Sequence, residues 1–190
     1  MFPSMARYAL GICLIVVMAD PAGAGDRALT VYGGRVTDER WFESLSLNAR
    51  FVDAYILVTA LAWTVKSSRE GGLAVEVEGQ VARYFGDQDH LEFNLPVALR
   101  WHRFSWDHVV DTSLAFGLGP SWAAEDPEVE KAINGSTRQF LVHWFAEVAL
   151  GPPGTAWAAV FRLHHRSTGF GLVADDGGSN TLTLGLRFRF

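Results

Sequence analysis

The sequence has one cysteine, few basic residues and a single long hydrophobic run. One Cys among 190 residues excludes an intramolecular disulfide framework and a Cys-rich zinc site. The 16 Lys and Arg are outnumbered by 21 Asp and Glu, which argues against a nucleic-acid-binding protein, because phosphate binding needs a basic face. The 13% aromatic content argues against a disordered chain, and the length fits one domain or at most two small ones.

The single hydrophobic run lies at the N-terminus. Arg7 precedes an apolar stretch from Tyr8 to Ala19, and Ala22-Gly23-Ala24 follows it. A basic start, a short apolar core and an A-x-A site are the three parts of a secretory signal peptide, and the core is shorter than the roughly 20 residues that span a bilayer. We therefore expect a cleaved signal peptide over residues 1–24 and one domain over 25–190. An uncleaved membrane anchor is the alternative.

Beyond position 24, apolar residues recur at every second position, which is the pattern of β-strands. The last ten residues show it most clearly, since five apolar side chains (Leu182, Leu184, Leu186, Phe188 and Phe190) alternate with Thr, Gly and Arg. The same alternation predicts seven earlier strands, near 29–35, 52–66, 73–85, 91–101, 112–122, 140–148 and 157–163. The sequence thus predicts an all-β, eight-stranded antiparallel up-and-down transmembrane β-barrel.

The connections between the predicted strands support this architecture. Those after even strands (67–72, 104–107 and 151–154) are tight, whereas three of those after odd strands (36–50, 124–135 and 168–179) are long and 86–89 is short. Outer-membrane barrels have short periplasmic turns and long extracellular loops. We therefore expect the chain termini on the periplasmic side and localisation in a bacterial outer membrane.

A soluble barrel of the lipocalin type is the rival fold, with its apolar face turned inward. Two features disfavour it. The polar faces carry small Ser, Ala and Gly beside Glu, Gln and Asn, as a narrow filled lumen would. The apolar faces end in aromatic residues such as Trp63, Trp101, Trp122, Trp157 and Phe190, which suit the boundary between lipid and water.

The six histidines form no H-E-x-x-H pattern or comparable ligand cluster, so the sequence predicts no metal site. His90, His102 and His108 fall near strand ends or turns and are expected on the solvated surface. His143 shares its strand face with Glu147. We expect that pair to belong to a buried polar network that fills the lumen.

One segment, Phe161-Arg-Leu-His-His-Arg-Ser-Thr-Gly-Phe170, combines groups that can do chemistry. His165 and Ser167 have the same parity as Phe161 and Leu163, so both continue the lipid-facing stripe of the seventh strand. Residues two apart on a strand lie about 6.5–7 Å apart on one face. A His beside a Ser is the minimal base and nucleophile pair for acyl transfer, and here it falls at the extracellular end of the strand.

The motif His165-Arg166-Ser167 on the penultimate strand of such a barrel resembles the lipid A 3-O-deacylases of the PagL type, also grouped with acyloxyacyl hydrolase-like proteins. The likeness is carried by His164-His165-Arg166-Ser167, by the loop Asp175–Asn180 and by the final strand that ends at Phe190. The resemblance implies that His165 is the base and Ser167 the nucleophile. It also implies a lipid A or lipopolysaccharide substrate and no cofactor.

The sequence departs from the family pattern at two places. The family usually has Asn after the serine, where it helps to form the oxyanion site, and this chain has Thr168 and Gly169. Their backbone amides are the candidate donors. The family's third member is a carboxylate about a dozen residues beyond the serine, which falls near Ser179 here. We expect Asp176 or Asp175 to orient the imidazole.

Two other functions stay open at the level of sequence. A non-enzymatic structural or adhesive barrel is favoured by the missing carboxylate and by the acidic loop Glu125, Asp126, Glu128 and Glu130. A soluble periplasmic lipid-binding barrel is the third interpretation. The expected function remains an ester hydrolase that acts on lipid A among outer-membrane lipids.

Overall fold

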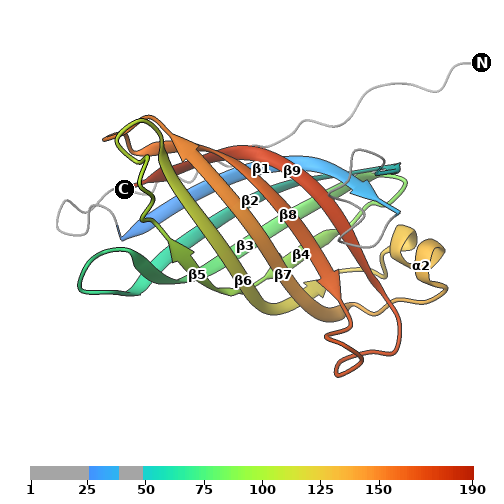
Figure 1. Ribbon diagram of the computed structural model, residues 1–190. Coiled ribbons are helices and arrows are strands. Elements are labelled where there is room, and N and C mark those ends of the chain that lie inside the picture. Colours follow the sequence, from blue (N-terminus) through green and yellow to red (C-terminus); the bar gives the residue numbers. More distant parts are fainter. Residues whose placement is uncertain (1–25, 39–48) are drawn as a thin grey trace, which may run out of the picture.

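The computed structural model describes residues 26–38 and 49–190. The expected signal peptide, 1–24, and most of the first long connection lie outside the described residues. The described chain forms one closed antiparallel sheet and a short helix (Figure 1). No helix among the described residues is long and apolar enough to cross a membrane.

The sheet contains nine strands that occupy eight positions in the barrel wall. They are β1 (Arg27–Thr37), β2 (Phe51–Ser67), β3 (Leu73–Gly86), β4 (Leu91–Asn94), β5 (Val97–Trp101), β6 (Asp111–Ala123), β7 (Phe140–Gly151), β8 (Trp157–Ser167) and β9 (Gly178–Arg189). Strands that follow one another in the chain pair antiparallel, with β4 and β5 sharing one position between β3 and β6, and β1 pairs with β9 to close the ring. The predicted eight-stranded antiparallel up-and-down transmembrane barrel is confirmed.

Strands β4 and β5 are two halves of the predicted strand 91–101, and both pair with β3 and β6. Pro96 causes the break because it has no backbone N–H to give to the ladder. The wall continues across the break, since Leu95 N donates to Pro120 O at 3.1 Å and Pro96 O accepts from Glu78 N at 2.9 Å.

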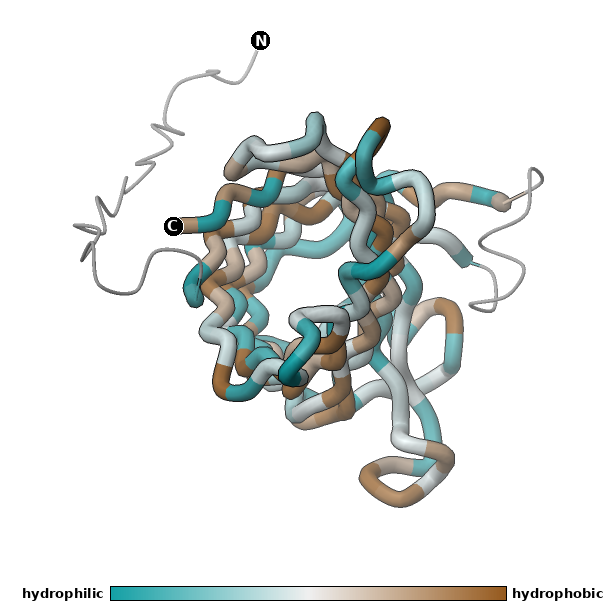
Figure 2. Tube along the Cα trace, turned by 60° about the vertical axis from the view of Figure 1, so that its left-hand side comes forward, coloured by the Kyte–Doolittle hydropathy of each residue, from teal (hydrophilic) through white to brown (hydrophobic). Residues whose placement is uncertain are grey.

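The outer face of the barrel is apolar and the inner face is largely polar. Burial alternates along most of the strands, and most of the exposed positions of the wall are apolar. Hydrophilic and hydrophobic residues accordingly alternate along the trace of the barrel wall (Figure 2). The aromatic residues predicted at the boundary point outward, with Trp63, Trp101, Trp122 and Trp157 between 40% and 48% exposed. A lipocalin-type barrel would bury this face, so that alternative is wrong.

Buried ion pairs fill the part of the lumen beneath β3, β5, β7, β8 and β9. Arg162 pairs with Glu78 at 2.6 Å and with Glu147 at 2.5 Å, and Arg100 pairs with Glu147 at 2.8 Å. Arg187 adds a contact to Glu76 at 2.7 Å. Each buried charge thus meets an opposite charge, the condition under which charges are tolerated away from water.

The other part of the lumen is apolar, which the sequence interpretation does not anticipate. Tyr32, Val36, Ala54, Ile56, Val58, Ala60, Ala82 and Tyr84 form one buried cluster, and β2 is therefore apolar on both faces. Val129 of helix α2 (Glu128–Asn134) joins this cluster. The helix lies at the end of the barrel opposite the C-terminus (Figure 1).

The connections divide by length much as predicted. Those at the end near the C-terminus span 68–72, 102–110 and 152–156, and the middle one is longer than expected. Asp107 organises it by accepting hydrogen bonds from the backbone N–H groups of Phe104 and Thr112. The longer connections, 124–139 with helix α2 and 168–177, lie at the opposite end of the barrel. β8 ends and β9 begins at this end.

Candidate functional site

His165 and Ser167 lie on the outer face of β8, at the end near helix α2. Their neighbours across the sheet are set by register: Trp144 of β7 and Asn180 of β9 flank His165, so three outward side chains form one row across the wall. The imidazole is partly buried and packs on the Trp144 ring, with 4.4 Å between ring centroids. The predicted pair therefore shares one face and one end of the strand.

Asn180 holds the imidazole of His165. The His165 Nδ1 atom lies 2.6 Å from Asn180 Oδ1, and Asn180 is only 6% exposed. An amide oxygen can only accept a hydrogen bond, so Nδ1 carries the proton and Nε2 keeps its lone pair. Asn180 thus selects the tautomer in which His165 can act as a base.

The expected orienting acids occupy a different place. Asp175 and Asp176 are exposed in the loop before β9, and Asp176 Oδ2 lies 3.5 Å from Ser136 Oγ. The structure gives the position beside the imidazole to Asn180 instead, because strand pairing places residue 180 opposite residue 165. The expected contact of Asp175 or Asp176 with the imidazole is therefore not formed in this structure, and Asn180 is the residue that contacts it.

A tight loop begins directly after Ser167. Gly169 has φ +64° and its N–H donates to Ser167 Oγ at 3.3 Å, which places a backbone donor at the hydroxyl. Thr168 O accepts from Val173 N at 3.0 Å and closes the loop. Opposite Ser167, Gly178 has φ +112°, a conformation that favours glycine, and it leaves that side of the hydroxyl without a side chain.

Among the described residues, no hydrogen bond joins Ser167 Oγ to His165. The two residues share a face at the spacing of alternate strand positions, and Ser167 instead accepts from Gly169 N. Catalytic hydrogen bonds are commonly long before substrate is bound and shorten in the complex.

The wall that carries this row is fastened from inside by helix α2. Glu130 is 1% exposed and contacts Arg166 at 3.1 Å, Ser179 Oγ at 2.9 Å and Thr137 Oγ1 at 2.7 Å. Burial raises the pKa of the Glu130 carboxyl. Arg166 lies between His165 and Ser167 in the chain, and Ser179 precedes Asn180. Glu130 thus holds the end of β8 and the start of β9, which carry His165, Ser167 and Asn180. Because it is buried, Glu130 does not belong to the exposed acidic part of the loop.

An apolar groove of about 470 Å³ runs along the outer wall below the site. Its lining includes Leu163, Phe161, Phe116, Leu114, Leu99 and Trp101, from β8 across β6 to β5. Leu163 is the residue two positions before His165 on the same face. Leu163 is the lining residue nearest to His165 along β8, and from there the lining continues toward the end of the barrel that carries the C-terminus.

The remaining histidines divide between surface and interior. His108 is exposed as expected, whereas His90 is 3% exposed and stacks on Tyr84 with 4.5 Å between ring centroids. Burial lowers the pKa of His90 to about 4. His143 and His164 both point into the lumen. Glu147 joins the buried ion pairs, but neither ring nitrogen of His143 has a hydrogen-bond partner within the described chain.

Comparison with solved structures places this architecture among eight-stranded barrels of outer membranes. The fold is similar to that of the outer membrane enzyme PagL, with a TM-score of 0.62, 10% sequence identity, and coverage of 86% of this chain and 99% of that one. It is also similar to Neisserial surface protein A, with a TM-score of 0.53, 11% identity, and coverage of 88% and 99%. No family model and no curated protein matches the sequence.

Proposed function

We propose that this protein is a lipid A 3-O-deacylase of the bacterial outer membrane, with Ser167 as nucleophile and His165 as general base. The observation that carries the proposal is a group of three outward residues near the long loops, Ser167 and His165 at the end of β8 and Asn180 on β9, which is called the row from here on. A nucleophile, a base and a group that orients the base are the three parts of a hydrolytic triad, and asparagine serves as the third part in some of them.

The chemistry follows from the atoms in this row. His165 Nε2 takes the hydroxyl proton as Ser167 Oγ bonds to the ester carbonyl carbon. The N–H of Gly169, which donates to Ser167 Oγ before reaction, is the proposed donor to the resulting oxyanion. Collapse breaks the bond to the sugar oxygen, which receives the proton from the imidazolium. Water then attacks the acyl-serine with His165 again as base, which releases the fatty acid and restores the hydroxyl.

The position of the row selects a substrate in the membrane. Ser167 and His165 face outward from the wall, toward lipid, and not into the filled lumen. Their end of the barrel carries the long loops, which in outer-membrane barrels are extracellular, so the row lies at the outer leaflet. The apolar groove beside Leu163 offers an acyl chain a path down the wall. An acylated saccharide with its ester at the leaflet boundary meets all three conditions.

The direct test is expression in a bacterial outer membrane followed by mass spectrometry of lipid A. We expect the appearance of lipid A that lacks one 3-hydroxyacyl chain, together with the free 3-hydroxy fatty acid. An unchanged lipid A profile from cells with well-folded protein would contradict the proposal and favour a structural or adhesive barrel. Recovery as a soluble periplasmic species would contradict the membrane location as well.

A second prediction concerns Asn180 as a positioning residue. Asn180→Leu removes the acceptor at 2.6 Å from His165 Nδ1 and leaves the tautomer unselected. We expect kcat to fall about 10- to 100-fold with little change in KM, because the base is misplaced while substrate contacts remain. Asn180→Asp restores an acceptor oxygen and is expected to recover most of the activity.

The matched control for Asn180 is Asp176→Asn, which alters an exposed carboxylate that does not contact the imidazole. Steady-state kinetics on purified lipid A in detergent should show Asp176→Asn within about twofold of the wild type. A large loss in Asp176→Asn with normal activity in Asn180→Leu would assign the orienting role to the aspartate and overturn the assignment to Asn180.

A further inference from the structure

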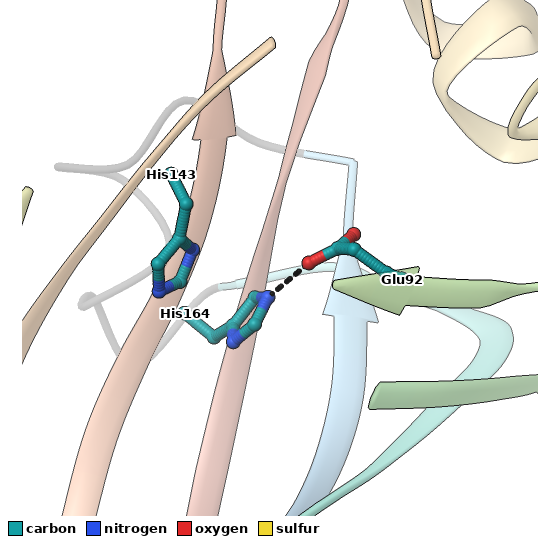
Figure 3. Close-up of side chains that lie close together, drawn as sticks. All are labelled: Glu92, His143 and His164. Atoms are coloured by element: carbon teal, nitrogen blue, oxygen red, sulfur yellow. Dashed lines mark hydrogen bonds and ion pairs between the residues drawn. The ribbon is translucent and has the colours of Figure 1, made fainter. Parts of the chain in front are cut away.

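Three side chains from separate strands converge inside the lumen behind β8. Glu92 comes from β4, His143 from β7 and His164 from β8, and Figure 3 shows the two imidazoles side by side with the carboxylate facing His164. His164 Nε2 lies 2.9 Å from Glu92 Oε1, and the two imidazole rings are 4.3 Å apart at their centroids. One ligand atom from each residue lies within 4.8 Å of the other two.

His143 supplies an independent indication of a ligand. The side chain is 0% exposed, and within the described residues neither Nδ1 nor Nε2 has a hydrogen-bond partner. Glu92 Oε2 in the same cluster also lacks one, although Arg166 Nε lies 3.5 Å away. A buried polar group left without a partner destabilises the fold, so a bound ligand at this imidazole would remove that cost.

We propose that Glu92, His143 and His164 bind a transition-metal dication of the zinc class. Two neutral imidazoles and one carboxylate form a ligand set that Zn²⁺ accepts in proteins. With bonds of about 2.1 Å, two ligands of a tetrahedral ion lie about 3.4 Å apart. The observed span of at most 4.8 Å exceeds that value by about 1.4 Å, and His143, whose ring nitrogens make no hydrogen bond within the described residues, is the ligand that would move to close it.

Neighbouring groups are arranged to hold these ligands in place. His164 Nδ1 lies 3.1 Å from Tyr32 Oη, which in turn donates to Gln80 Oε1 at 3.3 Å. This pair of hydrogen bonds lets His164 Nδ1 keep its proton and leaves Nε2 free to bind the ion. Metal-binding histidines commonly donate their other ring N–H in this way. Asn94 Nδ2 donates to Glu92 Oε1 at 2.7 Å and fixes the carboxylate.

The charge of the lumen also suits a cation. The buried residues include five glutamates (Glu76, Glu78, Glu92, Glu130 and Glu147) but four arginines (Arg100, Arg162, Arg166 and Arg187). The carboxylates therefore outnumber the guanidinium groups by one. A bound dication would offset this excess negative charge. It would also link β4, β7 and β8 on the inner side of the wall that carries His165.

The test measures zinc bound by the purified barrel. The protein is refolded in detergent with a stoichiometric amount of ZnCl₂, passed through gel filtration, and analysed for zinc by elemental analysis and for its thermal midpoint. We expect about one zinc per chain and a higher midpoint than in zinc-free refolded protein. Co²⁺ in place of Zn²⁺ should give the intense visible absorption of a tetrahedral site.

His143→Leu and His90→Leu are a matched pair of variants. Both remove a buried imidazole, and His143 gives up no hydrogen bond, so the variant is expected to fold. His143→Leu should retain less than a tenth of the wild-type zinc, while His90→Leu should retain all of it. Wild-type protein without bound zinc, or equal zinc in His143→Leu, would overturn the proposal. Neither readout uses the deacylase activity, so its failure and that of the proposed function are separable.

Discussion

Ser167→Ala is expected to abolish release of the 3-hydroxy fatty acid from lipid A. The substitution removes the hydroxyl oxygen that we propose bonds to the ester carbonyl carbon. The base, its orienting amide and the groove stay in place, so substrate still binds. Loss of a nucleophile in a triad lowers kcat by far more than loss of a substrate contact, and we expect a fall of at least about 1000-fold.

Ser136→Ala is the matched control for this measurement. Ser136 lies in the same group of loops as Ser167, and its hydroxyl contacts Asp176 rather than the imidazole. Both variants should fold, as judged by the shift in electrophoretic mobility between heated and unheated barrel. Mass spectrometry of lipid A from cells that express each variant should find modification with Ser136→Ala and none with Ser167→Ala. Full modification with Ser167→Ala would exclude Ser167 as the nucleophile.

Arg162→Met is expected to cause the largest loss of stability among single substitutions in the lumen. The guanidinium of Arg162 contacts Glu78 at 2.6 Å and Glu147 at 2.5 Å, and it lies 3.9 Å from the centroid of the Phe145 ring. Methionine keeps much of the volume but leaves both carboxylates without this counter-charge. Breaking a buried pair in this way costs about 3–5 kcal/mol of the free energy of unfolding.

Arg35→Met is the control that separates the loss of a buried ion pair from the loss of an exposed one. Arg35 also pairs with a carboxylate, at 2.5 Å from Asp53, but both side chains are substantially exposed. An exposed pair contributes at most about 1 kcal/mol. Urea titration of both variants in the same lipid or detergent should therefore separate them by at least about 2 kcal/mol. Equal losses would mean that the lumen network does not stabilise the barrel through its buried charges.

The fold could be predicted because its determinants are local. A side chain on a strand points to the face opposite its neighbours, so alternation over 140–148 or 182–190 already separates outside from inside. The even number of segments and the connection lengths then indicate a closed barrel. The strand split at Pro96 and the apolar sector around Ile56 and Val58 could not be predicted, because they depend on which side chains meet across the lumen.

The candidate site was partly predictable for the same reason. Parity along β8 places His165 and Ser167 on one outward face without knowledge of any other strand. The partner of the imidazole depends on the register between β8 and β9, which pairs His165 with Asn180. Sequence proximity to a carboxylate pointed instead to Asp175 and Asp176, and the fold leaves both exposed.

The sequence by itself determined which residues face lipid and which face the lumen, because a period of two needs only the geometry of one strand. Tertiary structure decided which of the inward residues meet. Glu92, His143 and His164 are far apart in the chain, and only closure of the barrel brings their ligand atoms within 4.8 Å. Likewise, Glu130 reaches Arg166 and Ser179 only because helix α2 folds over the end of the barrel. Contacts across the lumen depend on the circumference of the barrel and on the register between its strands. The alternation of residues along one strand gives no information on either.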